Sequence, residues 1–356
     1  MDNDKQSIVP REKTYLTVVI HVLYRVNIEN ITDEQVLSQI DVLNEDFSKT
    51  NSNFSDTPDI FAGVAADTEI QFCLATVDPE GNSTSGITRT QTNVDDIGLT
   101  DAYFRTNEGG IDAWDNSKYI NIWVADMGTS SVSGTGTFPG QAIPPEKDGI
   151  LVNFKFFGRE GIAEDFFPHN LGRICTHEMG HFFGVPHIFG SIGTACDVDD
   201  GFTDTPLQDA PSFACPDFPA PDLCTQNNGV MFMNFMDYTD DECMSMFTED
   251  QKNRMWETLN GPRSDLKSVN QDMCIVDTST PEVSAEWNLS PNPAKSLIFI
   301  NDKKFIHGIA TIYDITGKIC LTQRIRADKV SLDISRLQSG IYIVKYKQSV
   351  KKLVVQ

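Results

Sequence analysis

The sequence predicts an α/β (α+β) domain with a twisted mixed sheet, followed by a small all-β sandwich of the immunoglobulin-like type. Three observations lead to this prediction. Strand-like and helix-like segments alternate over the first 260 residues, short alternating strands follow residue 280, and the charge changes sign between the two parts. The length of 356 residues also suits two domains better than one.

The first domain is predicted to begin with a buried strand and an amphipathic helix. Tyr15–Tyr24 reads YLTVVIHVLY, a β-branched apolar run typical of an interior strand. Thr32–Gln35 matches a capping box, and apolar residues recur behind it at helical spacing. Further strands are expected at Glu69–Ala75, Tyr119–Ala125 and Gly149–Phe154.

A second helix is predicted to begin near Pro168–Asn170 and to end at Gly184, because glycine tolerates the left-handed conformation that commonly follows a helix. From Ile188 to Cys243 the chain reads as loop. A loop of this length inside a compact domain is usually functional or held by external ties. A last helix is expected over Thr248–Leu259.

The character of the chain changes near residue 280. Strand-like segments between turn residues follow: SPNPAKSLIFI, ATIYDITGKIC, VSLDIS and GIYIVKYKQSVKKLVV. Residues 281–356 hold 12 Lys and Arg against 6 Asp and Glu, whereas residues 1–280 hold 16 against 45. We therefore predict two domains, 1–278 and 279–356.

The net charge of −23 limits the classes of partner. An acidic body repels phosphates, which argues against nucleic acid. It suits basic substrates, although solubility alone also explains it. No apolar run approaches the roughly 20 residues of a transmembrane helix. Met1–Pro10 lacks the apolar core of a signal peptide, which leaves a cytosolic protein or a chain whose leader has been removed.

The chain contains eight cysteines, and half of them lie in the polar loop: Cys196, Cys215, Cys224 and Cys243. None forms a CxxC pair, which disfavours a zinc knuckle. Covalent ties stabilise long irregular loops, so we expect two disulfides and an oxidising compartment. Four buried free thiols are the alternative. The partners of four other cysteines stay open: Cys73, Cys175, Cys274 and Cys320.

Three of the six histidines fall within eleven residues, HEMGHFFGVPH (His177–His187). On a helix, His177 and His181 share a face one turn apart, and the glycine bend brings His187 back as a third ligand. Three imidazoles suit zinc and leave a fourth position open, which is the mark of a catalytic site. Glu178 is placed to address a water. A helix with incidental histidines and a non-catalytic zinc site are the alternatives.

This motif resembles the long zinc-binding sequence of the metzincin metalloproteases. Metzincins also carry a methionine in a tight turn beneath the metal, and Met231–Tyr238 (MFMNFMDY) supplies Met236 for that position. Two stretches, NFMDYTDDECMSMFTEDQKNRM and CDVDDGFTDTP, are similar to the pappalysin family in its bacterial, ulilysin-like branch. The resemblance covers about residues 12–275 and implies a metzincin catalytic domain with a zinc-site helix.

The resemblance implies roles for further residues. Tyr238 would stabilise the oxyanion of the transition state. Asp241 matches an acid at the base of the pocket for the side chain after the scissile bond, which implies cleavage before Arg or Lys. The rival interpretation of Asp241 is a solvated acid among several. The family pairing of the loop cysteines is Cys196–Cys224 and Cys215–Cys243.

The segment DDGFTDTP resembles the calcium loop of the family. The ligands that this resemblance implies are Asp200 and Thr205, with Asp204 and the carbonyl of Thr203 beside them. Carboxylate and carbonyl oxygens suit calcium. A solvated acidic turn is the alternative.

The C-terminal segments LSPNPAKSLIFI, IYDITGKI and LQSGIYIVKY resemble the sorting domain of the bacterial type IX secretion system. The resemblance implies contact with that secretion machinery and an extracellular or cell-surface location. It leaves open whether the tail is removed. An accessory β-sandwich that binds glycan or protein is the alternative.

Together these features predict a secreted zinc-dependent endopeptidase, in which Glu178 is the general base. A substrate strand is expected along an exposed sheet edge, with Ser133–Gly140 as a rim. Two alternative functions are a catalytically silent metzincin-scaffold adhesin and a zinc hydrolase with a non-peptide substrate. The presence of Glu178 disfavours the adhesin.

Overall fold

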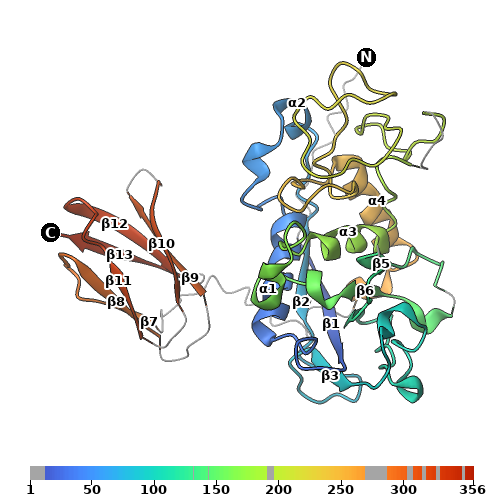
Figure 1. Cartoon of the computed structure of the whole chain (residues 1–356), viewed down its shortest axis with the longest axis horizontal. Helices are drawn as coiled ribbons and strands as arrows, with labels where there is room; N and C mark the ends of the chain where they lie inside the picture. The colour runs from blue at the N-terminus through green and yellow to red at the C-terminus, as the bar shows by residue number, and fades with distance from the viewer. Residues whose placement is uncertain are drawn as a thin grey trace, which may run out of the picture. The chain divides into compact units, whose positions relative to one another are not determined.

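The computed structural model describes residues 13–130, 132–142, 144–190, 196–268, 287–302, 308–314, 318–325, 329–346 and 349–356. The chain divides into two compact units, Met1–Val276 and Asp277–Gln356, which are treated separately below (Figure 1). The predicted domain boundary at residues 278 and 279 lies outside the described residues.

A mixed sheet forms the centre of the first unit. Its strands are β1 (Thr14–Tyr24), β2 (Ile70–Leu74), β3 (Ile87–Gln91), β4 (Ile120–Ala125), β5 (Gly134–Gly136) and β6 (Ile150–Asn153). The order is β2-β1-β4-β6-β5, and β3 pairs with a further part of β1. All pairs are parallel except β5 with β6. The short antiparallel β5 is therefore the last strand at one edge.

Helix α1 (Asp33–Phe47) begins as the sequence predicts, but its capping differs in one respect. Thr32 accepts a hydrogen bond from the amide of Gln35 at 3.2 Å. The Gln35 side chain does not complete a capping box. Its amide nitrogen donates to the carbonyls of Phe154 and Phe157, at 3.2 and 2.9 Å, and its oxygen accepts from the Ile162 amide at 3.3 Å instead of the Thr32 amide. Tertiary partners thus replace the local one.

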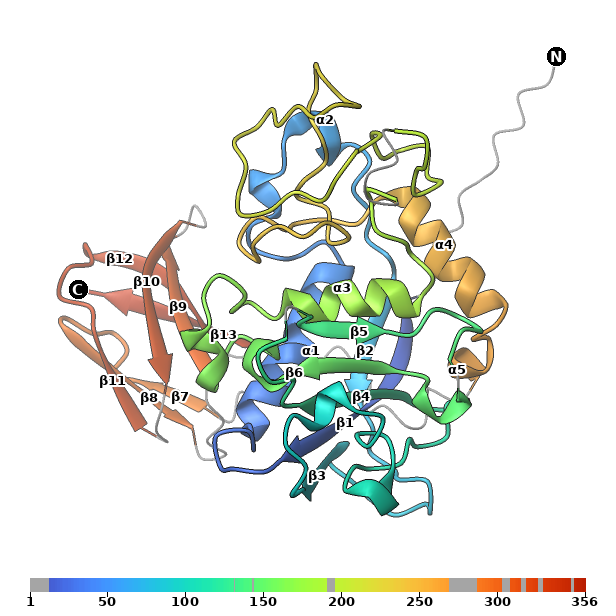
Figure 2. The same ribbon diagram turned by 45° about the vertical axis from the view of Figure 1, so that its right-hand side comes forward.

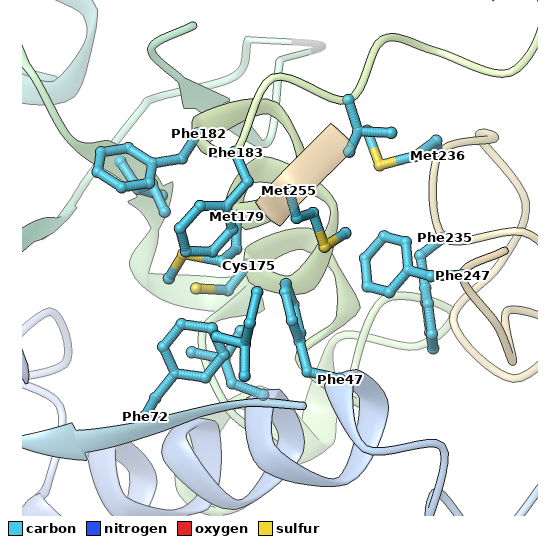
Figure 3. Packing of buried hydrophobic residues seen from close by; sticks show 14 of the residues in the cluster. Phe47, Phe72, Cys175, Met179, Phe182, Phe183, Phe235, Met236, Phe247 and Met255 are labelled. Atoms are coloured by element: carbon cyan, nitrogen blue, oxygen red, sulfur yellow. The ribbon is translucent and has the colours of Figure 1, made fainter. Parts of the chain in front are cut away.

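Two further helices complete the core of the first unit. Helix α3 (Arg173–Phe182) crosses one face of the sheet near β5 and β6 (Figure 2). Helix α4 (Glu249–Asn260) has a complete capping box between Thr248 and Gln251. Apolar side chains from α1, α3, α4 and the sheet meet in one cluster (Figure 3). The ring of Phe47 lies edge-on to Phe72 at its centre, with 4.9 Å between ring centroids.

The remaining helical segments of the first unit are short. They are α2 (Asp59–Ala62), α5 (Asp265–Ser268), η1 (Phe54–Asp56), η2 (Ile97–Leu99), η3 (Thr106–Glu108), η4 (Pro145–Lys147), η5 (Phe154–Phe156) and η6 (Gly161–Asp165). None of the helices in the described part of the chain has the length and apolar character that a bilayer crossing requires.

The predicted loop from Ile188 to Cys243 contains no helix or strand among its described residues. Two disulfides close it, Cys196–Cys224 and Cys215–Cys243, the pairing that the family resemblance implies. Cys73 is also disulfide-bonded, and Cys274 lies outside the described residues. The described free cysteines are two, Cys175 and Cys320.

The second unit consists of two antiparallel sheets around a common apolar core. Strands β10 (Ile319–Ile325), β9 (Gly308–Asp314), β12 (Gly340–Tyr346) and β13 (Ser349–Val355) form one sheet, in that order. Strands β11 (Lys329–Asp333), β8 (Leu297–Asp302) and β7 (Trp287–Ser290) form the other. This architecture agrees with the predicted small all-β domain.

His21 is a core residue on β1 and not a metal ligand. Its Nδ1 lies 2.8 Å from the Thr88 hydroxyl and its Nε2 lies 2.9 Å from the Asn121 side-chain oxygen. Burial lowers the pKa of His21 from 6.5 to about 4, against an opposing hydrogen bond with Asn121. The neutral ring is therefore the form that the folded protein prefers.

This burial predicts a loss of stability in acid. Above pH 6.5 the ring is neutral in both states, so the contribution of His21 is fully present. As the pH falls from 6.5 toward 4, only the unfolded state binds the proton, and the free energy of unfolding decreases by about 3 kcal/mol. Denaturant unfolding should show that the free energy of unfolding falls more steeply between pH 6.5 and pH 4 for the wild type than for His21→Gln. Parallel pH profiles would contradict it.

Candidate active site

Helix α3 carries two of the motif histidines and owes its starting point to a buried carboxylate. Asp241 accepts hydrogen bonds from the amides of Leu171 and Arg173, at 2.8 and 3.3 Å. The Arg173 amide belongs to the first turn, where donors have no partner inside the helix and negative charge is favourable, and Leu171 lies just before the helix. His177 and His181 then follow one turn apart on the buried face of the helix.

The three motif histidines converge. Nitrogen atoms of His177, His181 and His187 all lie within 4.8 Å of one another, and His181 Nε2 is 2.9 Å from His187 Nε2. The Nδ1 atoms of His177 and His181 face the carbonyls of Phe235 and Val185, at 2.7 and 2.8 Å. Carbonyls accept only, so each Nδ1 carries the proton and each Nε2 is free to bind a cation.

The imidazoles are in the protonation state that a metal requires. Burial lowers the pKa of His181 to about 4 and that of His187 to about 3, and it places that of His177 well below 6.5. All three rings are therefore neutral near pH 7, and neutral imidazole is the ligand form. The donor set fits zinc with three protein ligands and an open fourth position.

The bend after α3 and the turn at Met236 hold this cluster together. Gly184 adopts φ +84°, a left-handed conformation that favours glycine, and its amide donates to the His181 carbonyl at 2.8 Å. The amide of Ile188 donates to the Met236 carbonyl at 3.2 Å. The Met236 side chain is buried against Gly180, where an added Cβ would overlap its sulfur. The methionine turn thus packs directly against the helix.

Glu178 faces the glycine strand β5. A Cβ on Gly134 would lie 2.9 Å from Glu178 Cγ, and one on Gly136 would overlap the Glu178 carbonyl. Glycines at both positions therefore allow α3 and the strand to approach closely. Burial raises the pKa of Glu178 to about 8, opposed by a hydrogen bond from the Gly136 backbone. A cation beside the carboxylate favours its charged form and lowers this pKa again.

A cavity of about 620 Å³ opens over the histidines. It is lined by the three imidazoles and by residues of several elements: Val132–Gly136, Phe138, His169, Ile174, Glu178, Phe213, Asp237, Tyr238, Thr239 and Met244. The Tyr238 hydroxyl lies 3.0 Å from His187 Nε2. The expected rim Ser133–Gly140 thus contributes several residues to the wall of this cavity.

Asp241 does not line the cavity directly. Its side chain is fully buried, and His169, which does line the cavity, places Nδ1 3.4 Å from Asp241 Oδ1. Sequence reasoning did not single out His169. It lies outside the metal-binding spacing, and only the tertiary fold brings it to the carboxylate.

The predicted calcium residues lie in one turn of the long loop, beside the start of α4. The Thr205 hydroxyl donates to Asp200 at 2.9 Å. Asp204 accepts from the Thr248 hydroxyl and the Asp250 amide, at 2.8 and 2.9 Å, and the Thr203 amide donates to Asp250. Burial raises the pKa of Asp200 to about 7. Asp200 is thus a poorly solvated carboxylate, whereas Asp204 orients the first turn of the helix.

Four features define the class of protein: a mixed sheet, a helix with two histidines, a third histidine after a glycine bend, and a methionine turn beneath them. The first unit is a metzincin-type zinc metallopeptidase domain.

Comparison with known proteins identifies the family. Residues 106–260 match peptidase family M43, described as pregnancy-associated plasma protein-A. The fold is similar to mature mirolysin of Tannerella forsythia, solved in complex with a cleaved peptide: the TM-score is 0.69 and the identity 41%, over 73% of this chain and 97% of that chain. The extracellular metalloprotease of Arthroderma gypseum is 29% identical over 264 residues, which span 72% of this chain and 76% of that protein.

The chain belongs to the pappalysin family of metzincin metallopeptidases. Residues 288–356 match the secretion system C-terminal sorting domain. The protein is therefore a secreted zinc metallopeptidase with a sorting tail.

Proposed function

We propose that the protein is an endopeptidase that cleaves on the amino side of Arg or Lys. The observation that carries this proposal is the buried Asp241 carboxylate, whose Oδ1 has no hydrogen-bond partner and lies just behind the cavity wall. A basic side chain that reached it would supply the missing partner. The excess of acidic residues in 1–280 also attracts basic peptides.

The proposed mechanism uses side chains that line the cavity. His177, His181 and His187 would hold the zinc, which would supply Lewis-acid activation of the attacking water and the scissile carbonyl. Glu178 accepts the proton of that water and delivers it to the leaving amine. Tyr238 moves its hydroxyl from His187 to the developing oxyanion and donates a hydrogen bond there.

The sheet edge at β5 is the proposed place for the substrate backbone. β5 is the last strand of the sheet, pairs with β6 on one side and lines the cavity on the other. An extended peptide can add to such an edge through main-chain hydrogen bonds. This position brings the scissile bond beside Glu178, which packs against the same strand.

We also propose that the chain divides into two domains, 1–278 and 279–356, with different roles. The first part carries the peptidase site, and the second directs export by contact with type IX secretion machinery. The match of residues 288–356 to a sorting domain supports this assignment.

The experiment that tests the proposed specificity is cleavage-site mapping in a mixed peptide library by mass spectrometry. We expect cuts before Arg or Lys for the wild type and loss of this preference in Asp241→Asn. An Asp241→Asn protein that kept the basic preference would refute the pocket assignment. A zinc-loaded wild type that cut no peptide would favour the adhesin or the non-peptide hydrolase.

We also propose a calcium site at Asp200 and Thr205, with Asp204 and the Thr203 carbonyl nearby. The buried Asp200 carboxylate supports it, because a divalent cation favours the charged form. Calcium at about 100 times its Kd should raise the free energy of unfolding by about 2.7 kcal/mol. Asp200→Asn should lose this response and the exposed control Asp197→Asn should keep it. Equal stability with calcium and with a calcium chelator would contradict the site.

A further inference from the structure

We propose that His169 controls specificity by competing with the basic side chain of the substrate for the Asp241 carboxylate. The inference rests on the proposed peptidase function and adds a specificity-determining residue to it. His169 would act as an internal cation that occupies the pocket when protonated and vacates it when neutral.

The geometry leaves one oxygen of Asp241 for this competition. Oδ2 already accepts the amides of Leu171 and Arg173. Oδ1 is buried without a hydrogen-bond partner, and so is Nδ1 of His169, 3.4 Å away. A guanidinium or ammonium group entering from the cavity can reach only Oδ1. It therefore competes with the imidazole for the same oxygen.

His169 can leave and return without disturbing the core. Its side chain is 31% exposed, whereas that of Asp241 is 0% exposed. The ring packs edge-on against Phe156, with 5.9 Å between centroids. The backbone on both sides is fixed, since the His169 amide donates to Phe166 at 3.0 Å and the Asp241 amide donates to Pro168 at 3.2 Å. The two residues thus stay adjacent while the ring rotates.

The surrounding charges leave one negative charge to be balanced. The buried Arg173 guanidinium donates to the Asp241 carbonyl and lies 3.5 Å from Asp46 Oδ1. The carboxylate that this guanidinium pairs with is therefore that of Asp46, whereas its contact with Asp241 is to the main chain. Asp240 adds a further negative charge near His169. An imidazolium or a substrate cation can supply the balance, and two cations at Oδ1 would repel each other.

The titration of these groups gives the competition a pH dependence. The contact with Asp241 and its charge raise the pKa of His169, against partial burial. The imidazolium therefore persists to higher pH than that of an ordinary histidine. Asp46 titrates as well, because burial raises its pKa to about 6. Glu178 and Asp237 also line the cavity. The test must separate His169 from these carboxylates.

The test compares kcat/KM for two peptides that differ only in the residue after the scissile bond, Arg or Leu. The ratio cancels the titration of the shared catalytic groups. For the zinc-loaded wild type we expect the Arg/Leu ratio to rise about tenfold between about pH 5.5 and pH 8.5. For His169→Asn we expect a high ratio that does not change with pH. A flat wild-type ratio, or the same rise in His169→Asn, would overturn the proposal.

A binding measurement keeps the proposal testable apart from catalysis. The imidazole signals of His169 are followed by NMR during pH titration, with and without a product peptide that begins with Arg. We expect the pKa of His169 to fall when the peptide is bound, and an unchanged pKa would overturn the inference. Loss of cleavage of both peptides with this pKa change intact would refute the proposed function instead. His169→Gln replaces His169→Asn if the latter does not fold.

Discussion

Glu178→Gln is expected to lower kcat for peptide hydrolysis by about 10²- to 10⁴-fold while the zinc content stays at that of the wild type. Glutamine keeps the size of the side chain and its packing against β5, but it cannot accept the proton of the attacking water. Two of the three imidazoles do not depend on this carboxylate for their orientation, since the carbonyls of Phe235 and Val185 orient them.

The measurement is steady-state cleavage of a fluorogenic peptide, with metal analysis of the same samples. Glu249→Gln is a matched control, because this carboxylate is exposed on α4. The control should retain the wild-type rate. A Glu178→Gln protein that cleaved the peptide at the wild-type rate would refute the assigned base.

His181→Ala is expected to remove both zinc and activity. His181 supplies one of three ligand nitrogens, and loss of one ligand from a three-ligand site should weaken zinc binding by more than about 100-fold, since outer-shell partners alone contribute 10- to 100-fold. Activity should fall at least in proportion at limiting zinc. Dialysis against a chelator should have the same effect on the wild type. Added zinc should restore the activity of the wild type but not that of His181→Ala.

The control for this variant is His169→Asn, which removes an imidazole from the same cavity without touching the cluster. It should bind one zinc per chain. A His181→Ala protein that held zinc as tightly as the wild type would show that the metal, if present, is bound elsewhere.

Local sequence patterns were sufficient for most of the first unit. The strands around β1 and the helix with the motif histidines follow from periodicity and from stop signals such as Gly184, which depend on neighbours in the chain. The capping box at Thr248 formed for the same reason. The capping box at Thr32 formed only in part. The Gln35 side chain donates hydrogen bonds to the carbonyls of Phe154 and Phe157, which lie more than a hundred residues away in the sequence.

The environment of Asp241 could not be predicted in the same way. Its sequence neighbours suggested a solvated acid, and the family resemblance suggested a pocket base. The structure places it at the first turn of α3, behind His169 and beside Arg173. These three contacts join segments about seventy residues apart, and no spacing rule connects them. The disulfide-bonded state of Cys73 was open for the same reason.

The measurement that tests the central claim most directly is anomalous X-ray scattering at the zinc edge from crystals of the wild-type protein. The account predicts one strong peak about 2.0–2.1 Å from nitrogen atoms of His177, His181 and His187, with its remaining side open to the cavity. A zinc-saturated crystal without a peak among these imidazoles, or with its strong peak elsewhere, would contradict it.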